Sequence, residues 1–483
     1  MFTSFATLFV YFLALFAVAI LSYRRQKSES DFIIGNRSLN FWLTALSAHA
    51  SDMSSWLFLG YPALILVTGV SGAWAAIGLT VCMFLNWQFV APKLRTITEQ
   101  TNSLTLSAYF EARFADTSGY LRVVSAAMSI LFFTFYISSG LVALGLLVES
   151  LLHFSYTAGM SLGIVIVVLY VFSGGYRTVA WIDLFQGFFL LGVIAFIPTI
   201  LIFRTHGMGP ILDAVSAQHL TTSLFPDFKV VTLFHLLLSA LGWGLGYFGQ
   251  PHILTKFMGI RQVRDLKKAK YLGISWQAIA LTAATLIGLI GIYTFPQGLA
   301  SATEQEKIVL YLVQETLPPF FAGLVLCAIL AATTNVMAAQ ILVVASNLSE
   351  DFYKRIVRRR AGPVELLWIS RSSVIFISSI AFLVAFFQIS SIYELVLYSW
   401  SGLGASFGPL TLLSLYRKDI NRYGAFTGIL SGGLIAAIWP YFNARYQLGI
   451  PSIIVGFLVS IIAIQGVSFL TRKKCSLRNP HSH

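Results

Sequence analysis

The stretch SAHASDMSSWLFLGYP, residues 47–62, places a carboxylate, Asp52, inside a run that is otherwise apolar enough to cross a lipid bilayer. A carboxylate at the centre of a membrane helix costs at least about 2.5–3.5 kcal/mol, so such a residue indicates a functional site by default. The same run carries Gly60 and Pro62, both of which weaken a helix. We therefore predict a membrane-spanning helix that is interrupted near its middle.

A second interrupted span is predicted at LGWGLGYFGQPHIL, residues 241–254, which holds four glycines within eight residues and then Pro251. Each glycine weakens a helix by about 1 kcal/mol relative to alanine. Irregular backbone at bilayer depth is tolerated only where it lines a cavity or is buried in protein. Paired interruptions at corresponding positions of two repeats are typical of a transporter's central site, whereas two passively kinked packing helices are the alternative.

The composition indicates a polytopic all-α membrane protein. The chain has 483 residues, of which 57% are hydrophobic and 11% charged, and its mean hydropathy is +0.79. The first apolar run is expected to be a retained helix because no small-residue cleavage site follows it. About thirteen spans are predicted, at residues 5–23, 41–68, 70–91, 123–150, 157–174, 182–203, 231–251, 272–295, 310–346, 366–388, 391–415, 423–441 and 450–470.

The basic residues predict the orientation of these spans. All but four of the 32 Lys and Arg residues lie in or beside the segments that are cytoplasmic if the N-terminus is outside and the C-terminus inside. The same bias explains the net charge of +13. Basic runs such as KRIVRRR, residues 354–360, are expected to face anionic lipid of the bilayer rather than nucleic acid. The four exceptions are Arg204, Lys229, Lys307 and Arg445.

Several functional classes lack support in the sequence. It contains no Walker-type phosphate loop, no HExxH and no GxSxG, so ATP-driven transport and common hydrolytic activities are not expected. Cys82, Cys327 and Cys475 are far apart and suggest neither a disulfide framework nor a zinc site. We expect a single membrane domain over residues 1–483 that is not an enzyme and has no obligate protein partner.

Five motifs, in order, resemble the sodium/solute symporter family, and in particular its bacterial sodium/proline symporters. They are ASDMSSWL, LFFTFYISSG, FSGGYRTVAWIDLFQG, GWGLGYFGQPHIL and AILAATTNVMAAQILV. The resemblance implies a leucine-transporter-type fold with a five-plus-five inverted repeat, repeat one at 41–203 and repeat two at 231–415. The helix at 5–23 and the helices within 423–470 are additional. It also implies a multi-pass protein of the bacterial plasma membrane. This protein is expected to import a small zwitterionic solute together with sodium by alternating access, and L-proline is the leading candidate for the solute.

The resemblance assigns the solute site to aromatic and polar residues at both interruptions. Trp243 and Tyr247 lie four residues apart, hence on one helical face. Aromatic faces suit the apolar ring of proline and attract its ammonium group. Packing is the alternative role for aromatic residues at this spacing. The residues expected to bind solute are Ser54, Tyr136, Trp243, Tyr247, Gln250 and Pro251.

For sodium, the resemblance points to backbone carbonyls at Ala50, Met53 and Ala332. Asp52 is expected to attract the cation or to fix the end of the broken helix. Asp183 is expected near the inward sodium exit, with an ion pair to Arg177 as the alternative role.

The chain departs from the family at the two adjacent hydroxyl ligands. Asn335 and Val336 stand at those positions, and only the amide oxygen of Asn335 can bind a hard cation. Thr333 and Thr334 are close in sequence but face other directions around the helix. We therefore expect weakened or altered ion coupling. Proton coupling, for which His49 offers a titratable group, uncoupled uptake, and a non-transporting membrane sensor on the same fold remain alternatives.

Overall fold

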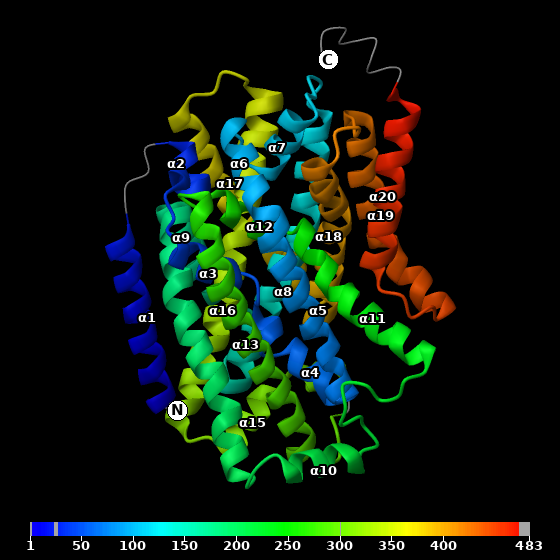
Figure 1. Cartoon of the computed structure of the whole chain (residues 1–483). Helices are drawn as coiled ribbons and strands as arrows, with labels where there is room; N and C mark the ends of the chain where they lie inside the picture. Colours follow the sequence, from blue (N-terminus) through cyan, green and yellow to red (C-terminus); the bar gives the residue numbers. More distant parts are fainter. Residues whose placement is uncertain (1, 24–27, 300, 473–483) are drawn as a thin grey trace.

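The computed structural model describes residues 2–23, 28–299 and 301–472, and the regular secondary structure in these ranges is helical. Figure 1 shows a bundle in which α1 (Phe2–Ser22) begins at the lower end and α20 (Ser452–Leu470) ends at the upper end. The short helices α2 (Glu29–Ile34), α6 (Ala91–Gln100) and α7 (Leu106–Arg113) lie at the upper end, beside basic segments. The basic residues at 24–27 and 473–478 lie outside the described residues.

Nine described helices are long and apolar enough to cross a membrane, and the bent pair of α3 (Phe41–Ala50) and α4 (Gly60–Thr68) makes a tenth span. A multi-pass membrane protein follows, while the number thirteen stays a prediction. The nine are the run Val70–Gln100 around α5 (Trp74–Leu85), α8 (Tyr120–Leu152), α9 (Tyr156–Arg204), α11 (Val230–Gly244) with its extension to Gly249, the run Val263–Thr294 around α13 (Leu266–Thr294), α16 (Pro319–Ser346) with its extension to Val357, α17 (Pro363–Phe386), α19 (Arg422–Tyr446) and α20.

Helix α9 contains two of the spans expected from the sequence, 157–174 and 182–203, joined at a kink. Its 49 residues are too long for one crossing, because a straight helix of that length would measure about 74 Å against a hydrocarbon core of about 30 Å. The kink lies at Gly175, where φ is +57° and an added Cβ would lie 2.9 Å from the ring of Phe32. Only glycine fits this backbone and this close approach.

The expected single span at 310–346 is divided in the structure into α15 (Ile308–Thr316) and α16. Pro318 and Pro319 cause the division, since neither residue has a backbone N–H to continue the helix. The loops also form short helices that the sequence patterns did not predict. These are α2, α6, α7, α10 (Gly209–Ala217), α12 (Pro251–Met258) and α14 (Ala302–Glu306).

Helix α16 is buried along most of its length and packs against α1, α8, α9 and α17. A helix that is apolar all round belongs in the interior of a bundle. On one side of the bundle, α19 and α20 pack against each other and against α18 (Ile392–Tyr416). The central position of α16 brings its middle turns against the interrupted first span, since α16 contacts α3 and the short helix η2 (Ser55–Leu57).

Candidate solute and ion site

The first predicted interruption is present between α3 and the segment Ser55–Thr68, which includes α4, and the chain bends by 65° between them. Helix α3 ends at Ala50, and the chain resumes with η2 at Ser55. Ser54 adopts a positive φ of +42°, and its hydroxyl accepts the N–H of Trp56 at 3.1 Å. This bond caps the new helical turn, so the interruption is stabilised by its own sequence.

The second predicted interruption separates α11 from α12. A tight 3-10 segment, η5 (Leu245–Gly249), is followed by Gln250 in extended conformation, and Pro251 then begins α12. The glycines permit close packing on α18, because an added Cβ at Gly249 would lie 2.6 Å from the backbone nitrogen of Gly408. Both breaks therefore lie where the sequence predicted them, and each exposes backbone groups inside the bundle.

A pocket of about 250 Å³ of empty space lies between the two breaks, and we call it the central pocket. Four of the six residues expected to bind solute line it, together with Asp52 and Met53. Four further residues that line it were not predicted from the sequence, namely Trp56, Leu79, Val396 and Trp400. The complete lining is Asp52, Met53, Ser54, Trp56, Leu79, Tyr136, Trp243, Tyr247, Val396 and Trp400.

Aromatic rings from four segments form most of the walls of the central pocket. The ring centroids of Trp56 and Trp243 are 4.6 Å apart at an interplanar angle of 41°. Tyr247 packs edge-on against Trp400 at 5.1 Å and 86°. The indole N–H of Trp400 donates to the carbonyl of Trp243 at 2.8 Å, which ties α18 to the second break. The indole N–H of Trp56, by contrast, has no hydrogen-bond partner among the described residues.

The carboxylate of Asp52 accepts a hydrogen bond from the hydroxyl of Tyr247. The side-chain amide of Gln277 donates in turn to the Tyr247 oxygen at 3.2 Å. No Lys or Arg forms an ion pair with Asp52 within the described part of the chain. The pocket thus holds a buried carboxylate whose partner is a neutral hydroxyl, which leaves its charge available to a cation or to an ammonium group.

The expected sodium ligands lie where α16 meets the first break. Ala50, Met53 and Ala332 are buried, and neither the oxygen nor the nitrogen of the Asn335 amide has a partner among the described residues. Val336 is buried as well. The hydroxyls of the two neighbouring threonines donate within their own helix, Thr333 to Ile329 and Thr334 to Leu330.

The other two expected solute residues, Gln250 and Pro251, do not line the central pocket. The Gln250 amide donates to the carbonyl of Trp400 at 3.1 Å, and Pro251 borders a second cavity. His49 is also absent from the lining of the central pocket. Its Nε2 accepts the indole N–H of Trp87 at 3.1 Å, and the two rings stack with their centroids 6.0 Å apart.

Asp183 lies on α9 and is fully buried. Its Oδ2 accepts the hydroxyl of Ser47 at 2.5 Å and pairs with the ammonium of Lys256 at 3.0 Å. Among the described residues its ion-pair partner is therefore Lys256 and not Arg177. Lys256 was not predicted from the sequence, because the pair joins residues 73 positions apart, although Lys256 lies only five residues after Pro251.

Comparisons with known proteins agree with this architecture. A sequence model described as the sodium:solute symporter family matches residues 32–432. The chain belongs to the sodium:solute symporter family. It is 38% identical over 456 residues to the high-affinity proline transporter PutP of Bacillus subtilis (strain 168), covering 94% of this chain and 95% of that protein. It is 37% identical over 469 residues to a sodium/proline symporter of Escherichia coli (strain K12), covering 96% of this chain and 92% of that protein.

Solved structures show the same fold. A substrate-bound, outward-open sodium-coupled sialic acid symporter superposes with a TM-score of 0.82 at 20% identity, over 97% of this chain and 98% of that one. The transporter MhsT in complex with L-phenylalanine superposes with a TM-score of 0.57 at 12% identity, covering 89% of this chain and 98% of that one. The predicted leucine-transporter-type fold is thereby confirmed. As a member of this family, the chain is a transporter.

Proposed function

We propose that this family member is a sodium-coupled importer of L-proline. The observation that carries the proposal is the central pocket, where both broken helices meet and where a buried carboxylate, a serine and five aromatic rings face one small space. The two bacterial relatives described above, named as proline transporters, match nearly the full chain. A secondary transporter binds its solute at such a meeting of interrupted helices.

The chemistry of the pocket suits a small amino acid with an apolar ring. The rings of Trp56 and Trp243, which are tilted against each other, offer apolar contact to a pyrrolidine ring and attraction to its ammonium. The unpartnered indole N–H of Trp56 is a donor for the solute carboxylate. Asp52 supplies a negative charge beside these groups. The pocket thus offers a group for each part of a zwitterion.

Sodium is the proposed coupling ion, held by the carbonyls of Ala50, Met53 and Ala332 with the amide oxygen of Asn335. The buried and unpartnered amide of Asn335 supports this ligand set, since oxygen atoms are the ligands that hard cations prefer. One expected ligand is missing, because Val336 offers only methyl groups. We therefore propose that sodium affinity is lower than in a site with both hydroxyls. Asp183 is proposed to act on the inward sodium path, where Lys256 competes with the ion for its carboxylate.

The proposed setting is the bacterial plasma membrane, with the N-terminus outside and the C-terminus in the cytoplasm. The concentration of Lys and Arg in the segments 93–122, 256–270 and 351–371 supports this orientation. Import then proceeds from the lower end of the bundle in Figure 1 toward the upper end, where these basic segments lie.

The test is uptake of labelled L-proline into proteoliposomes, with sodium and proton gradients imposed separately. We expect accumulation driven by sodium and none driven by a proton gradient alone. Accumulation with a proton gradient alone that is lost in His49→Ala would favour proton coupling instead. Binding of proline without accumulation under either gradient would favour a sensor.

A further inference from the structure

A second cavity lies directly beyond the central pocket, on the side of the basic segments. We call it the inner cavity, and it contains about 490 Å³ of empty space. The two spaces meet at His252, whose ring packs edge-on against Tyr136 at a centroid distance of 6.1 Å. Tyr136 lines the central pocket, and His252 lines the inner cavity.

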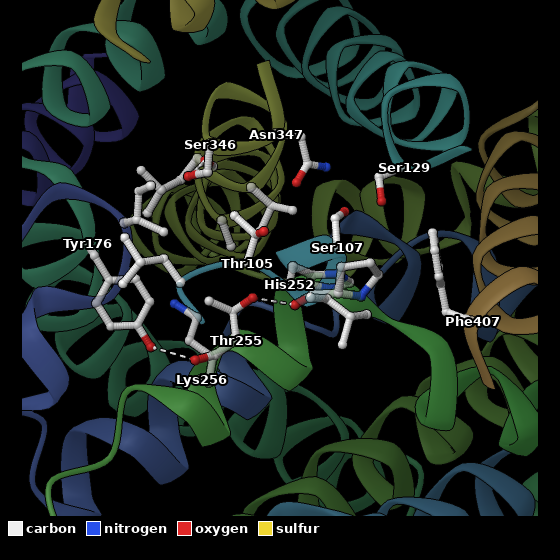
Figure 2. A pocket seen from close by; sticks show the side chains of 17 residues that line it. Thr105, Ser107, Ser129, Tyr176, His252, Thr255, Lys256, Ser346, Asn347 and Phe407 are labelled. Atoms are coloured by element: carbon white, nitrogen blue, oxygen red, sulfur yellow. Dashed lines mark hydrogen bonds between the residues drawn. The ribbon is translucent and has the colours of Figure 1, made fainter. Parts of the chain in front are cut away.

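Polar groups without partners lie on the wall of the inner cavity. His252 is 1% exposed, and neither of its ring nitrogens has a hydrogen-bond partner among the described residues. The side-chain nitrogen of Asn347, a residue that is 3% exposed, also has no hydrogen-bond partner among the described residues. A buried polar group left without a partner costs about 1–3 kcal/mol. Figure 2 shows Asn347 and Ser107 above the cavity and His252 and Thr255 below it, so these groups converge on one space.

The side chains that line the inner cavity indicate which kind of ligand it can bind. Among the described residues the lining contains no Asp or Glu, and its one cation, Lys256, is already paired with Asp183, so the cavity is poorly suited to a lone cation. The N–H groups of His252 and Asn347 are donors for a carboxylate, and the hydroxyl of Ser107 can accept from an ammonium. Apolar side chains, including Leu342 and Phe407, cover the remaining walls. The groups present match a small zwitterion with a hydrocarbon body.

We propose that the inner cavity is a second binding site for the transported amino acid, occupied between release from the central pocket and exit at the basic face. This proposal rests on the proposed function only in taking L-proline as the solute. It assigns His252 and Asn347 to the binding of the solute carboxylate. The central pocket, at about 250 Å³, has less empty space than the inner cavity.

The structure also closes this second site toward the basic face. Leu104, Thr105 and Leu106 line the cavity, and the segment that holds them is tied down on both sides. The hydroxyl of Thr105 donates to Asp351 at 3.0 Å. The guanidinium of Arg37 donates at 2.8 Å to the carbonyls of Ser103 and Met258. A solute that reaches the inner cavity is therefore retained until these bonds separate.

The test uses a thiol placed in the cavity wall of the full-length protein. Ser107→Cys is introduced after Cys82, Cys327 and Cys475 are replaced by serine, and the rate of alkylation by a small maleimide is measured in detergent at increasing L-proline. We expect proline to slow alkylation several-fold. The concentration for half-protection should be unchanged by Trp243→Ala and raised at least tenfold by either His252→Phe or Asn347→Leu.

Two results overturn the proposal. Protection that weakens with Trp243→Ala and is unaffected by His252→Phe and Asn347→Leu would show that it is transmitted from the central pocket. Absence of protection in protein that accumulates proline would show that no second site exists. Labelled uptake by the same preparation tests the proposed function separately, and each variant is first checked for a monodisperse elution profile. Both His252→Phe and Asn347→Leu are measured, so that if one variant does not fold, the other still tests the proposal.

Discussion

The buried pair of Asp183 and Lys256 gives a prediction whose size follows from the structure. The side chains are 0% and 2% exposed, and the ammonium lies 3.0 Å from the carboxylate. Removing one member of such a pair leaves the other charge buried without compensation, which costs about 3–5 kcal/mol. We therefore expect Lys256→Met and Asp183→Asn each to lower the free energy of unfolding by that amount.

The double variant is the informative one. It leaves no buried charge, so its loss should be smaller than that of either single variant, and the coupling energy in the double-mutant cycle should be at least about 3–5 kcal/mol. Equilibrium unfolding in mixed micelles measures the three losses. The exposed pair of Lys307 and Glu304, at 3.0 Å with 20% and 38% exposure, is a matched control and should give a coupling of about 0–1 kcal/mol.

Sodium adds a second measurement to the same variants. In Lys256→Met the Asp183 carboxylate loses its cation, so we expect sodium to stabilise this variant more than the wild type, whereas choline should not. Losses in the double variant that equal the sum of the two single losses would refute the reasoning, because the two charges would then be energetically independent. A sodium effect equal in all four proteins would refute competition at this carboxylate.

Four further predictions concern the central pocket, the ion site and the orientation. Trp243→Ala should weaken apparent proline affinity several-fold in an uptake assay, as expected for an aromatic contact worth about 0.5–1.5 kcal/mol, while the exposed Trp368→Ala should leave it unchanged. Trp56→Phe keeps the ring but removes the unpartnered N–H, and proline binding should weaken about tenfold or more if that N–H meets the carboxylate. Asn335→Ser combined with Val336→Thr should lower the sodium concentration for half-maximal uptake, and wild-type uptake that already saturates at low sodium would contradict this. Cysteines introduced within 256–270 and 351–365 should react with impermeant reagents only from the cytoplasmic side, and labelling of both segments in intact cells would reverse the orientation.

The sequence predicted the parts of the fold that depend on local composition. Long apolar runs gave the spans, and the clustered glycines with Pro251 gave the second break, because a helix cannot remain regular through such a segment. The change of direction at Gly175 agrees with the expected boundary between the spans at 157–174 and 182–203, whereas the division at Pro318 was not predicted. Apolar residues on both sides of Pro318 favoured a single span over 310–346, because hydropathy alone does not mark where a helix ends.

Only some of the residues that line the central pocket were predicted from the sequence. Tyr136, Trp243 and Tyr247 came from motifs, and the structure brings them together with Asp52. Trp400 was missed, because its place opposite Tyr247 depends on how α18 packs onto η5. Contacts between distant segments leave no local signal in a single sequence.

The second broken span links the candidate sites through the spacing of its own residues. Trp243 and Tyr247 line the central pocket, His252 lines the inner cavity, and Lys256 pairs with Asp183. A spacing of four residues places Trp243 and Tyr247 about one helical turn apart before the break, and His252 and Lys256 about one turn apart after it, in α12. The break at Gln250 turns the chain between the second and third of them. A movement of α12 relative to α11 would therefore displace His252 and Lys256 together while Trp243 and Tyr247 stayed in place. Because Lys256 both lines the inner cavity and pairs with Asp183, such a movement would change the cavity wall and the ion pair together.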